Sequence, residues 1–237
     1  MDMSIEDQIN SEPGDSLAET SEDWRLIEAV EEHLRPYFGE VERVFDQSSP
    51  GPVHIDLHLF EASPEDELRT FVTTGLAQKP MNVPSEVEDP DEYRYAELLL
   101  HLPMDWPLEW GIVEDESRFW PIHAMSGLAN IPHSRESWIW GGHTMKNGDL
   151  EPYSPDTQLC AAIVCPSFLL PDDAEIVKVG DGRSVVLLTV AFIYREEFEF
   201  CVENGSEAFF DRIEESGLTP FEFFVLDKKR RNVCASQ

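Results

Sequence analysis

Short apolar runs of strand length, separated by clusters of proline and glycine, limit most tightly what this chain can fold into. Single helical segments interrupt these runs without the regular strand–helix–strand alternation that builds a parallel sheet. We therefore predict an α+β fold, in which a mixed, mostly antiparallel sheet with flanking helices forms a single domain. The expected strands cover residues 41–45, 53–60, 68–74, 95–102, 158–164, 175–179 and 185–193.

Apolar residues at helical spacing indicate the flanking helices. Ser21 can cap the first helix and Gly39 can end it. A second helix is expected to begin with Pro121 in its first turn and to end before Pro132. The apolar face of the first helix consists of Trp24, Ile27, Val30, Leu34 and Tyr37. Two further helical segments follow at residues 195–202 and 207–216.

The ends of the chain differ in composition from its body. A length of 237 residues allows one or two domains, and we favour one domain at residues 21–227. Residues 1–20 carry acidic residues, no Lys or Arg and almost nothing to pack, so we expect a disordered acidic tail. Residues 228–237 are expected to form a basic tail, whose residues 228–231 are more simply solvated than bound to an acidic patch.

The balance of charge limits the partners. With 48 acidic and 17 basic residues the net charge is −31, which would repel the phosphates of nucleic acid and of an anionic membrane. The acidity serves solubility, or it draws in a basic protein or peptide. Residues 1–21 lack the pattern of a signal peptide, and we expect a cytoplasmic protein. The cysteines lack CxxC spacing, so we interpret them as reduced, mostly buried thiols.

One strand carries a metal-like pattern. His54, Asp56 and His58 alternate with aliphatic residues and share one face, and with His143 they could hold Zn or Fe in a metal-dependent hydrolase. The simpler interpretation is a polar strand face, because the two strand histidines would lie roughly 13 Å apart. We therefore predict no metal or cofactor. The motifs GxSxG, GxGxxG and GxxxxGK[ST] do not occur, and we do not expect an enzyme.

Residues 138–149 combine two tryptophans, a Gly-Gly pair, one histidine and an Asn-Gly turn. This segment is too rich in glycine for a helix and too aromatic for a linker. We predict an ordered loop on the core that ends in a turn at Asn147 and Gly148. His143 is the best lone candidate for an acid, a base or a ligand, although such a histidine more often holds a loop through backbone groups.

Several segments, in their order along the chain, resemble the Suppressor of fused family, specifically its bacterial single-domain members. The resemblance runs from about residue 25 to about residue 225 and leaves both tails outside. The matching segments are residues 71–76 with Pro80 and Met81, 97–103 with Trp106 and Pro107, 120–122, 128–133, 138–148, 159–163 and 192–198.

This resemblance implies protein binding without catalysis. The animal relative sequesters a transcription-factor peptide, and the bacterial relatives are identified with immunity proteins that neutralise a toxin domain. The chain lacks room for the second domain of the animal form, so that two-domain clamp is not carried over. We expect an immunity-type inhibitor; the alternatives are a regulator that captures an extended peptide by strand addition, and the metal-dependent hydrolase. The candidate binding or structural loop comprises Thr74, Gly75, Met81, His133, Trp138, Trp140, Gly141, Gly142, His143, Thr144, Asn147 and Gly148.

Overall fold

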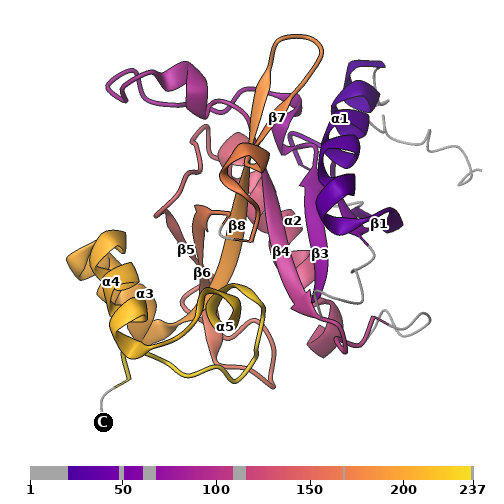
Figure 1. Ribbon diagram of the computed structural model, residues 1–237. Coiled ribbons are helices and arrows are strands. Elements are labelled where there is room, and N and C mark those ends of the chain that lie inside the picture. The colour runs from indigo at the N-terminus through magenta and orange to yellow at the C-terminus, as the bar shows by residue number, and fades with distance from the viewer. Residues whose placement is uncertain (1–20, 48–50, 61–67, 109–115, 168, 236–237) are drawn as a thin grey trace, which may run out of the picture.

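One mixed sheet forms the centre of the molecule (Figure 1). The computed structural model describes residues 21–47, 51–60, 68–108, 116–167 and 169–235. Its strand order is β1-β2-β3-β4-β8-β6-β5, with β7 paired to β8, and all neighbours are antiparallel except β4 and β8. The strands are β1 Val41–Gln47, β2 Ile55–Phe60, β3 Leu68–Thr74, β4 Ala96–Pro103, β5 Thr144–Lys146, β6 Leu159–Pro166, β7 Ile176–Lys178 and β8 Ser184–Tyr194. The predicted α+β fold with a mostly antiparallel, mixed sheet is confirmed.

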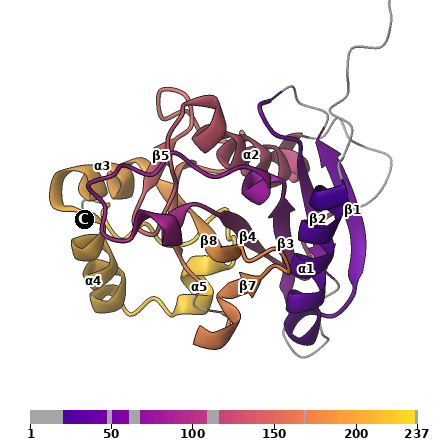
Figure 2. The same cartoon turned by 90° about the horizontal axis from the view of Figure 1, so that it is seen from above.

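Helices cover both faces of this sheet. Figure 2 shows α2 on one face, with α1 and α5 on the other. The helices are α1 Ser21–Phe38, α2 Glu116–Ser134, α3 Arg195–Asn204, α4 Ser206–Ser216 and α5 Pro220–Phe224, with short 3-10 turns η2 Leu76–Gln78, η3 Pro90–Tyr93 and η4 Asp172–Ala174. No helix within the described ranges is long and apolar enough to span a bilayer.

The alternation of side chains along β6 explains why its sequence is apolar throughout. Ala162 and Val164 pack into the cluster shared with α2, whereas Ala161 and Ile163 pack into the cluster shared with α3, α4 and α5. Strands that are covered on both faces need apolar residues at successive positions, not only at alternate ones. At its other end the second face is covered by α1, through Leu26, Val30, Leu34 and Phe38.

Two details of the predicted helices are wrong. The apolar spacing predicts Trp24 on the buried face of α1, but Trp24 is 58% exposed, whereas Leu26 is buried. The second helix begins at Glu116, before Pro121, and it includes Pro132. A proline inside a helix removes the N–H that would bond to the carbonyl four residues earlier. For Pro121 that carbonyl belongs to Ser117, and it accepts a 2.6 Å hydrogen bond from Lys228 Nζ.

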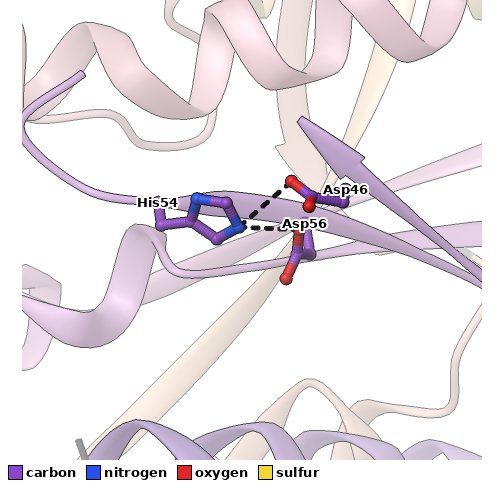
Figure 3. Close-up of side chains that lie close together, drawn as sticks. All are labelled: Asp46, His54 and Asp56. Atoms are coloured by element: carbon purple, nitrogen blue, oxygen red, sulfur yellow. Dashed lines mark ion pairs between the residues drawn. The ribbon is translucent and has the colours of Figure 1, made fainter. Parts of the chain in front are cut away.

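The β1–β2 hairpin places two aspartates opposite each other (Figure 3). The strands are antiparallel and Asp46 pairs with Asp56 in their register. His54 Nε2 lies 3.4 Å from Asp46 Oδ1 and 3.1 Å from Asp56 Oδ1. Like charges directly opposite each other destabilise a strand pair, so this arrangement requires a compensating group.

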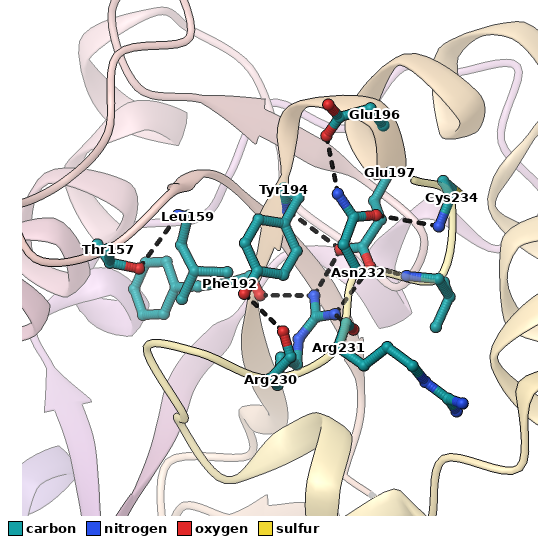
Figure 4. Close-up of polar contacts among 11 residues, drawn as sticks. Thr157, Leu159, Phe192, Tyr194, Glu196, Glu197, Arg230, Arg231, Asn232 and Cys234 are labelled. Carbon is teal, nitrogen blue, oxygen red and sulfur yellow. Dashed lines mark hydrogen bonds and ion pairs between the residues drawn. The ribbon is translucent and has the colours of Figure 1, made fainter. Parts of the chain in front are cut away.

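A buried ion pair attaches the C-terminal segment to α3 (Figure 4). Arg230 Nη1 and Nη2 donate to Glu197 Oε1 and Oε2 over 2.8 and 2.5 Å, and Nη2 also donates to Phe192 O over 3.0 Å. The carboxylate additionally accepts the backbone N–H groups of Tyr194 and Val233, each over 3.0 Å. Glu197 is fully buried, so these bonds replace the water that both charges lose.

This pair corrects the expectation of a solvated terminus for Lys228 and Arg230, whereas Lys229 and Arg231 are exposed. Arg230 is only 6% exposed, and Lys228 Nζ lies 2.7 Å from Asp156 Oδ2. The alternative, contact of these basic residues with acidic groups, is the one observed. The predicted acidic tail at residues 1–20 lies outside the described residues. All four cysteines are free, and Cys234 is the one that is half-buried rather than buried.

We predict that Arg230→Met lowers the free energy of unfolding by about 3–5 kcal/mol, because it leaves the Glu197 carboxylate buried without a counter-charge. The double variant Arg230→Met/Glu197→Leu should recover part of this loss. Arg35→Gln is the control, since its ion pair with Glu40 is exposed and worth roughly 0–1 kcal/mol. Urea denaturation measures all three. Equal losses in the Arg230 and Arg35 variants would contradict the role of the buried pair.

Candidate protein-binding surface

The predicted site residues are linked at the end of the sheet where β3 stops and β4 starts. Thr74 is the last residue of β3, and Gly75 follows it. Met81 and His133 lie beside this turn, and residues 138–144 form the loop that leads into β5. Asn147 and Gly148 lie beyond β5, where Asn147 N donates to Cys160 O over 2.9 Å and Gly148 has a φ of 50°.

Glu97 holds the turn after β3 from inside the protein. Its Oε1 accepts the N–H groups of Gly75 and Ala77, each over 3.0 Å, and its Oε2 accepts Thr73 Oγ1 over 2.7 Å. Burial raises the pKa of Glu97 to about 7, although these hydrogen bonds oppose the shift. A glycine is required at position 75, because φ is 118° there and a Cβ atom would lie 1.9 Å from His54 O.

Residues 79–95 leave this turn and pack against the tryptophan loop. Met81 is buried, and its N–H donates to Arg94 O over 2.8 Å. Asn82 N donates to Ser137 O over 3.0 Å, which ties the segment to the residues just before Trp138. His133 Nε2 adds a 2.8 Å bond to the carbonyl of η2 at Leu76. These hydrogen bonds position the segment so that Tyr93 lies against Trp138 and Trp140.

Tyr93 completes an aromatic cluster with the loop. Its ring centroid lies 4.5 Å from that of Trp140 and 5.9 Å from that of Trp138, both edge to face. His143 lies edge to face with Trp138 at 4.8 Å, and its Nδ1 accepts the N–H of Trp140 over 3.2 Å. All four side chains are half-buried. The cluster formed by these four residues is called the aromatic patch below.

His143 serves this loop as a structural residue. Burial lowers its pKa, and a backbone hydrogen bond with Trp138 partly opposes that shift. A neutral ring is also what the bond to Nδ1 requires, because a protonated Nδ1 cannot accept. Gly142 N donates to Val164 O over 2.7 Å, and Val164 N donates to His143 O over 2.9 Å, which fixes the loop on β6.

An acidic segment borders the aromatic patch. Residues 84–92 contain no Lys or Arg, and they precede Tyr93 directly in the chain. Arg94 follows, and its Nε lies 2.8 Å from Asp91 Oδ1. The segment forms the purple loop at the upper left of Figure 1. Its exposed carboxylates belong to Glu86, Glu88, Asp89, Asp91 and Glu92.

The structure does not assemble the hydrolase ligands that were considered. His58 Nδ1 lies 2.6 Å from Glu31 Oε1, and its Nε2 pairs with Thr74 Oγ1 over 3.0 Å. His143 lies beside β6, so β3, β4 and β8 separate it from the strand that carries Asp56. The arrangement of His54, Asp56, His58 and His143 around one ion is therefore wrong.

Sequence reasoning missed Glu97 and Tyr93. Glu97 stands directly before three leucines in a strand-like run, and a carboxylate in such a run signals a buried partner. Tyr93 gave no signal, because its contacts depend on how residues 79–95 cross the fold. A cavity of about 880 Å³ lies elsewhere, between α4, α5 and residues 225–231, and contains none of the predicted site residues.

We predict that the contribution of Glu97 to the free energy of unfolding falls as the pH rises from about 4.5 to about 7, while buried His101, whose pKa burial lowers to about 4, contributes in the opposite direction. The folded pKa of Glu97 is raised to about 7 from 4.5, so across this window the folded protein keeps a proton that the unfolded chain has lost. Glu97→Gln should reduce this pH dependence by up to about 3 kcal/mol. Urea denaturation at several pH values measures it, with the exposed Glu136→Gln as control. An unchanged dependence in Glu97→Gln would contradict the assignment.

We further predict that Gly142→Val lowers stability by about 1–3 kcal/mol, because φ is 87° at this position. Gly180→Val is the matched control: its φ is not in the left-handed region, and nothing lies within 4 Å of an added Cβ atom. Thermal denaturation of both variants provides the comparison. A Gly142 variant that melts with the wild type would show that the conformation is not required.

Comparisons with known proteins agree on the fold. A solved Suppressor of fused homologue from Neisseria gonorrhoeae has a TM-score of 0.62 at 14% identity, and the match covers 90% of this chain and 100% of that one. The crystal structure of the Sufu-Fu complex gives 0.60 at 12% identity, covering 88% and 92%. Drosophila Suppressor of Fused gives 0.60 at 13% identity, covering 88% of this chain and 51% of that chain.

Of the two sequence comparisons, one finds a match. A search of curated protein sequences gives none. The model of the Suppressor of fused protein (SUFU) family matches residues 51–231, which is most of the chain. This protein therefore belongs to the SUFU family.

Proposed function

We propose that this SUFU-family protein works by binding another protein, without catalysis, through the aromatic patch and the acidic segment beside it. The observation that carries the proposal is the pair of tryptophans with Tyr93, half-exposed on a loop that backbone hydrogen bonds hold in place. Tryptophan and tyrosine dominate the binding energy of protein interfaces, because each removes a large apolar area from water.

The scaffold orders this surface before a partner binds. Gly142, His143 and Asn82 are tied by backbone bonds to β6 and to the segment before Trp138. A surface that is already ordered loses little conformational entropy on binding. Affinity then depends on the contacts themselves.

The charge of the surface selects a basic partner. The exposed carboxylates of residues 86–92 border the patch, and the whole chain carries −31. Such a field accelerates association with a positively charged protein and disfavours acidic competitors.

In biological terms we propose a cytoplasmic, bacterial, immunity-type inhibitor, a negative regulator that neutralises a toxic partner. The family supports partner binding, since one structural relative was solved as the Sufu-Fu complex. From that relative we carry over the binding of a protein and nothing about its identity. The acidity of this chain favours a partner with a basic active surface, which an acidic inhibitor can cover.

A second candidate is the capture of an extended peptide by strand addition. Within the described residues, β1 pairs with β2 alone and β5 pairs with β6 alone, so each strand presents an edge. Such edges accept a further strand through main-chain hydrogen bonds. The β5 edge continues directly from His143 and favours this mode, because a peptide added there would also meet the aromatic patch.

We predict that Trp140→Ala weakens binding of the partner at least tenfold, which corresponds to about 1.4 kcal/mol. The partner is first identified by mass spectrometry from what the immobilised wild-type protein retains, and is then purified for calorimetry. Trp24→Ala is the matched control, because Trp24 is 58% exposed on α1, away from the patch. Equal affinities for the wild type and the Trp140 variant would contradict the proposed surface.

The inhibitor role has its own measurement. Expression of the purified partner's gene should arrest growth, and co-expression of the wild-type chain should restore it, whereas the Trp140 variant should restore it less. A partner that is harmless when expressed alone would leave binding intact and overturn the immunity role.

A further inference from the structure

We propose that Asp46, His54 and Asp56 form a binding site for one Zn²⁺ ion at the β1–β2 hairpin. This site is independent of the protein-binding surface and differs from the ligand set that the sequence suggested. Its ligand atoms all lie within 4.8 Å of one another, and they come from both strands of the hairpin and from the residue just before β2 (Figure 3).

The first support is the strand register. Asp46 and Asp56 are direct partners across β1 and β2, so the strand register holds the two carboxylates close together. His54 Nε2 approaches both carboxylates, at 3.4 and 3.1 Å. A divalent cation between these atoms would turn the repulsion of the carboxylates into coordination.

The second support is a buried carboxylate oxygen. Asp56 is 9% exposed, and its Oδ1 has no hydrogen-bond partner among the described residues. His54 Nε2 lies 3.1 Å from this oxygen, within ion-pair distance. Asp56 Oδ1 is therefore a buried oxygen without a hydrogen bond, close to a ring nitrogen and to a second carboxylate. Such an oxygen is suited to coordinate a cation.

The distances suit a first-row divalent metal. Zinc binds imidazole nitrogen and carboxylate oxygen at about 2.0–2.2 Å, which in a tetrahedral site places neighbouring ligand atoms about 3.3–3.6 Å apart. The separations of His54 Nε2 from the two carboxylate oxygens, 3.4 and 3.1 Å, are close to this spacing. Asp46 is 69% exposed at its side chain, so it can adjust, and water can fill the remaining positions. Because one ligand is imidazole, Zn²⁺ is favoured over Mg²⁺ and Ca²⁺.

The scaffold around these ligands is rigid. The backbone of His54 packs on Gly75, where an added Cβ atom would lie 1.9 Å from His54 O. Asp56 lies in β2 between two paired strands, opposite Asp46 on one side and Thr74 on the other. An ion bound here would join the edge strand β1 to the interior of the sheet and stabilise the hairpin.

Calorimetric titration of the metal-free full chain with ZnCl₂ tests the proposal. We expect one saturable equivalent, at least tenfold weaker binding in His54→Gln, and a melting temperature that rises with Zn²⁺ in the wild type only. His54 is a third exposed, so this variant should fold, and its unliganded melting curve checks that it does.

Controls separate the site from general attraction to an acidic protein. Asp149→Asn removes a carboxylate that is 99% exposed, and it should leave Zn²⁺ binding unchanged, whereas Asp46→Asn should weaken it. Excess Mg²⁺ should not displace Zn²⁺. Absence of a saturable equivalent, or equal Zn²⁺ affinity in folded His54→Gln and wild-type protein, would overturn the proposal.

Discussion

The buried carboxyl group of Glu97 is the interaction on which the rest of the candidate site depends. It satisfies two N–H groups of the turn after β3 and the hydroxyl of Thr73. Backbone N–H groups that are buried without a partner are costly, so Glu97 stabilises this turn by accepting from Gly75 and Ala77. The direction in which residues 79–95 leave the sheet follows from this turn.

That direction determines what the surface contains. The segment brings Tyr93 against the two tryptophans and leaves the carboxylates of residues 86–92 exposed beside them. A second buried carboxylate, Glu197, stabilises the C-terminal segment in a similar way, through its ion pair with Arg230. Glu97 lies in β4 of the sheet and Glu197 in α3, and both are fully buried. The position of the acidic segment therefore depends on a buried carboxylate, Glu97, that holds the turn before it.

The sequence predicted best what apolar patterning controls. Runs such as residues 68–74 are strands because both of their faces are buried, and they were located to within a few residues. Patterning failed at β5, which has only three residues, and at α5, which contains a Thr219 cap and Pro220 but only five residues. The start of α2 was misplaced because a lysine from the C-terminal segment occupies the carbonyl that Pro121 leaves free.

The candidate site was predictable only in part, for a related reason. The loop residues Trp138, Trp140 and His143 stand out by composition, whereas Tyr93 joins them through long-range packing. Likewise, the metal argument from one strand excluded His54 and His58 together, but it could not include Asp46. Asp46 reaches His54 through the register of two strands, which depends on the whole hairpin. Contacts between segments far apart in sequence leave no local pattern.

The central claim is that the aromatic patch and the acidic segment together form the partner interface. Hydrogen–deuterium exchange of the protein, alone and in complex with its identified partner, tests this claim most directly. The account predicts slower exchange in residues 86–94 and 138–146 on binding, with little change in α1 and in residues 218–231. Protection confined to β1, or to the cavity beside α5, with residues 86–94 and 138–146 unchanged, would contradict it.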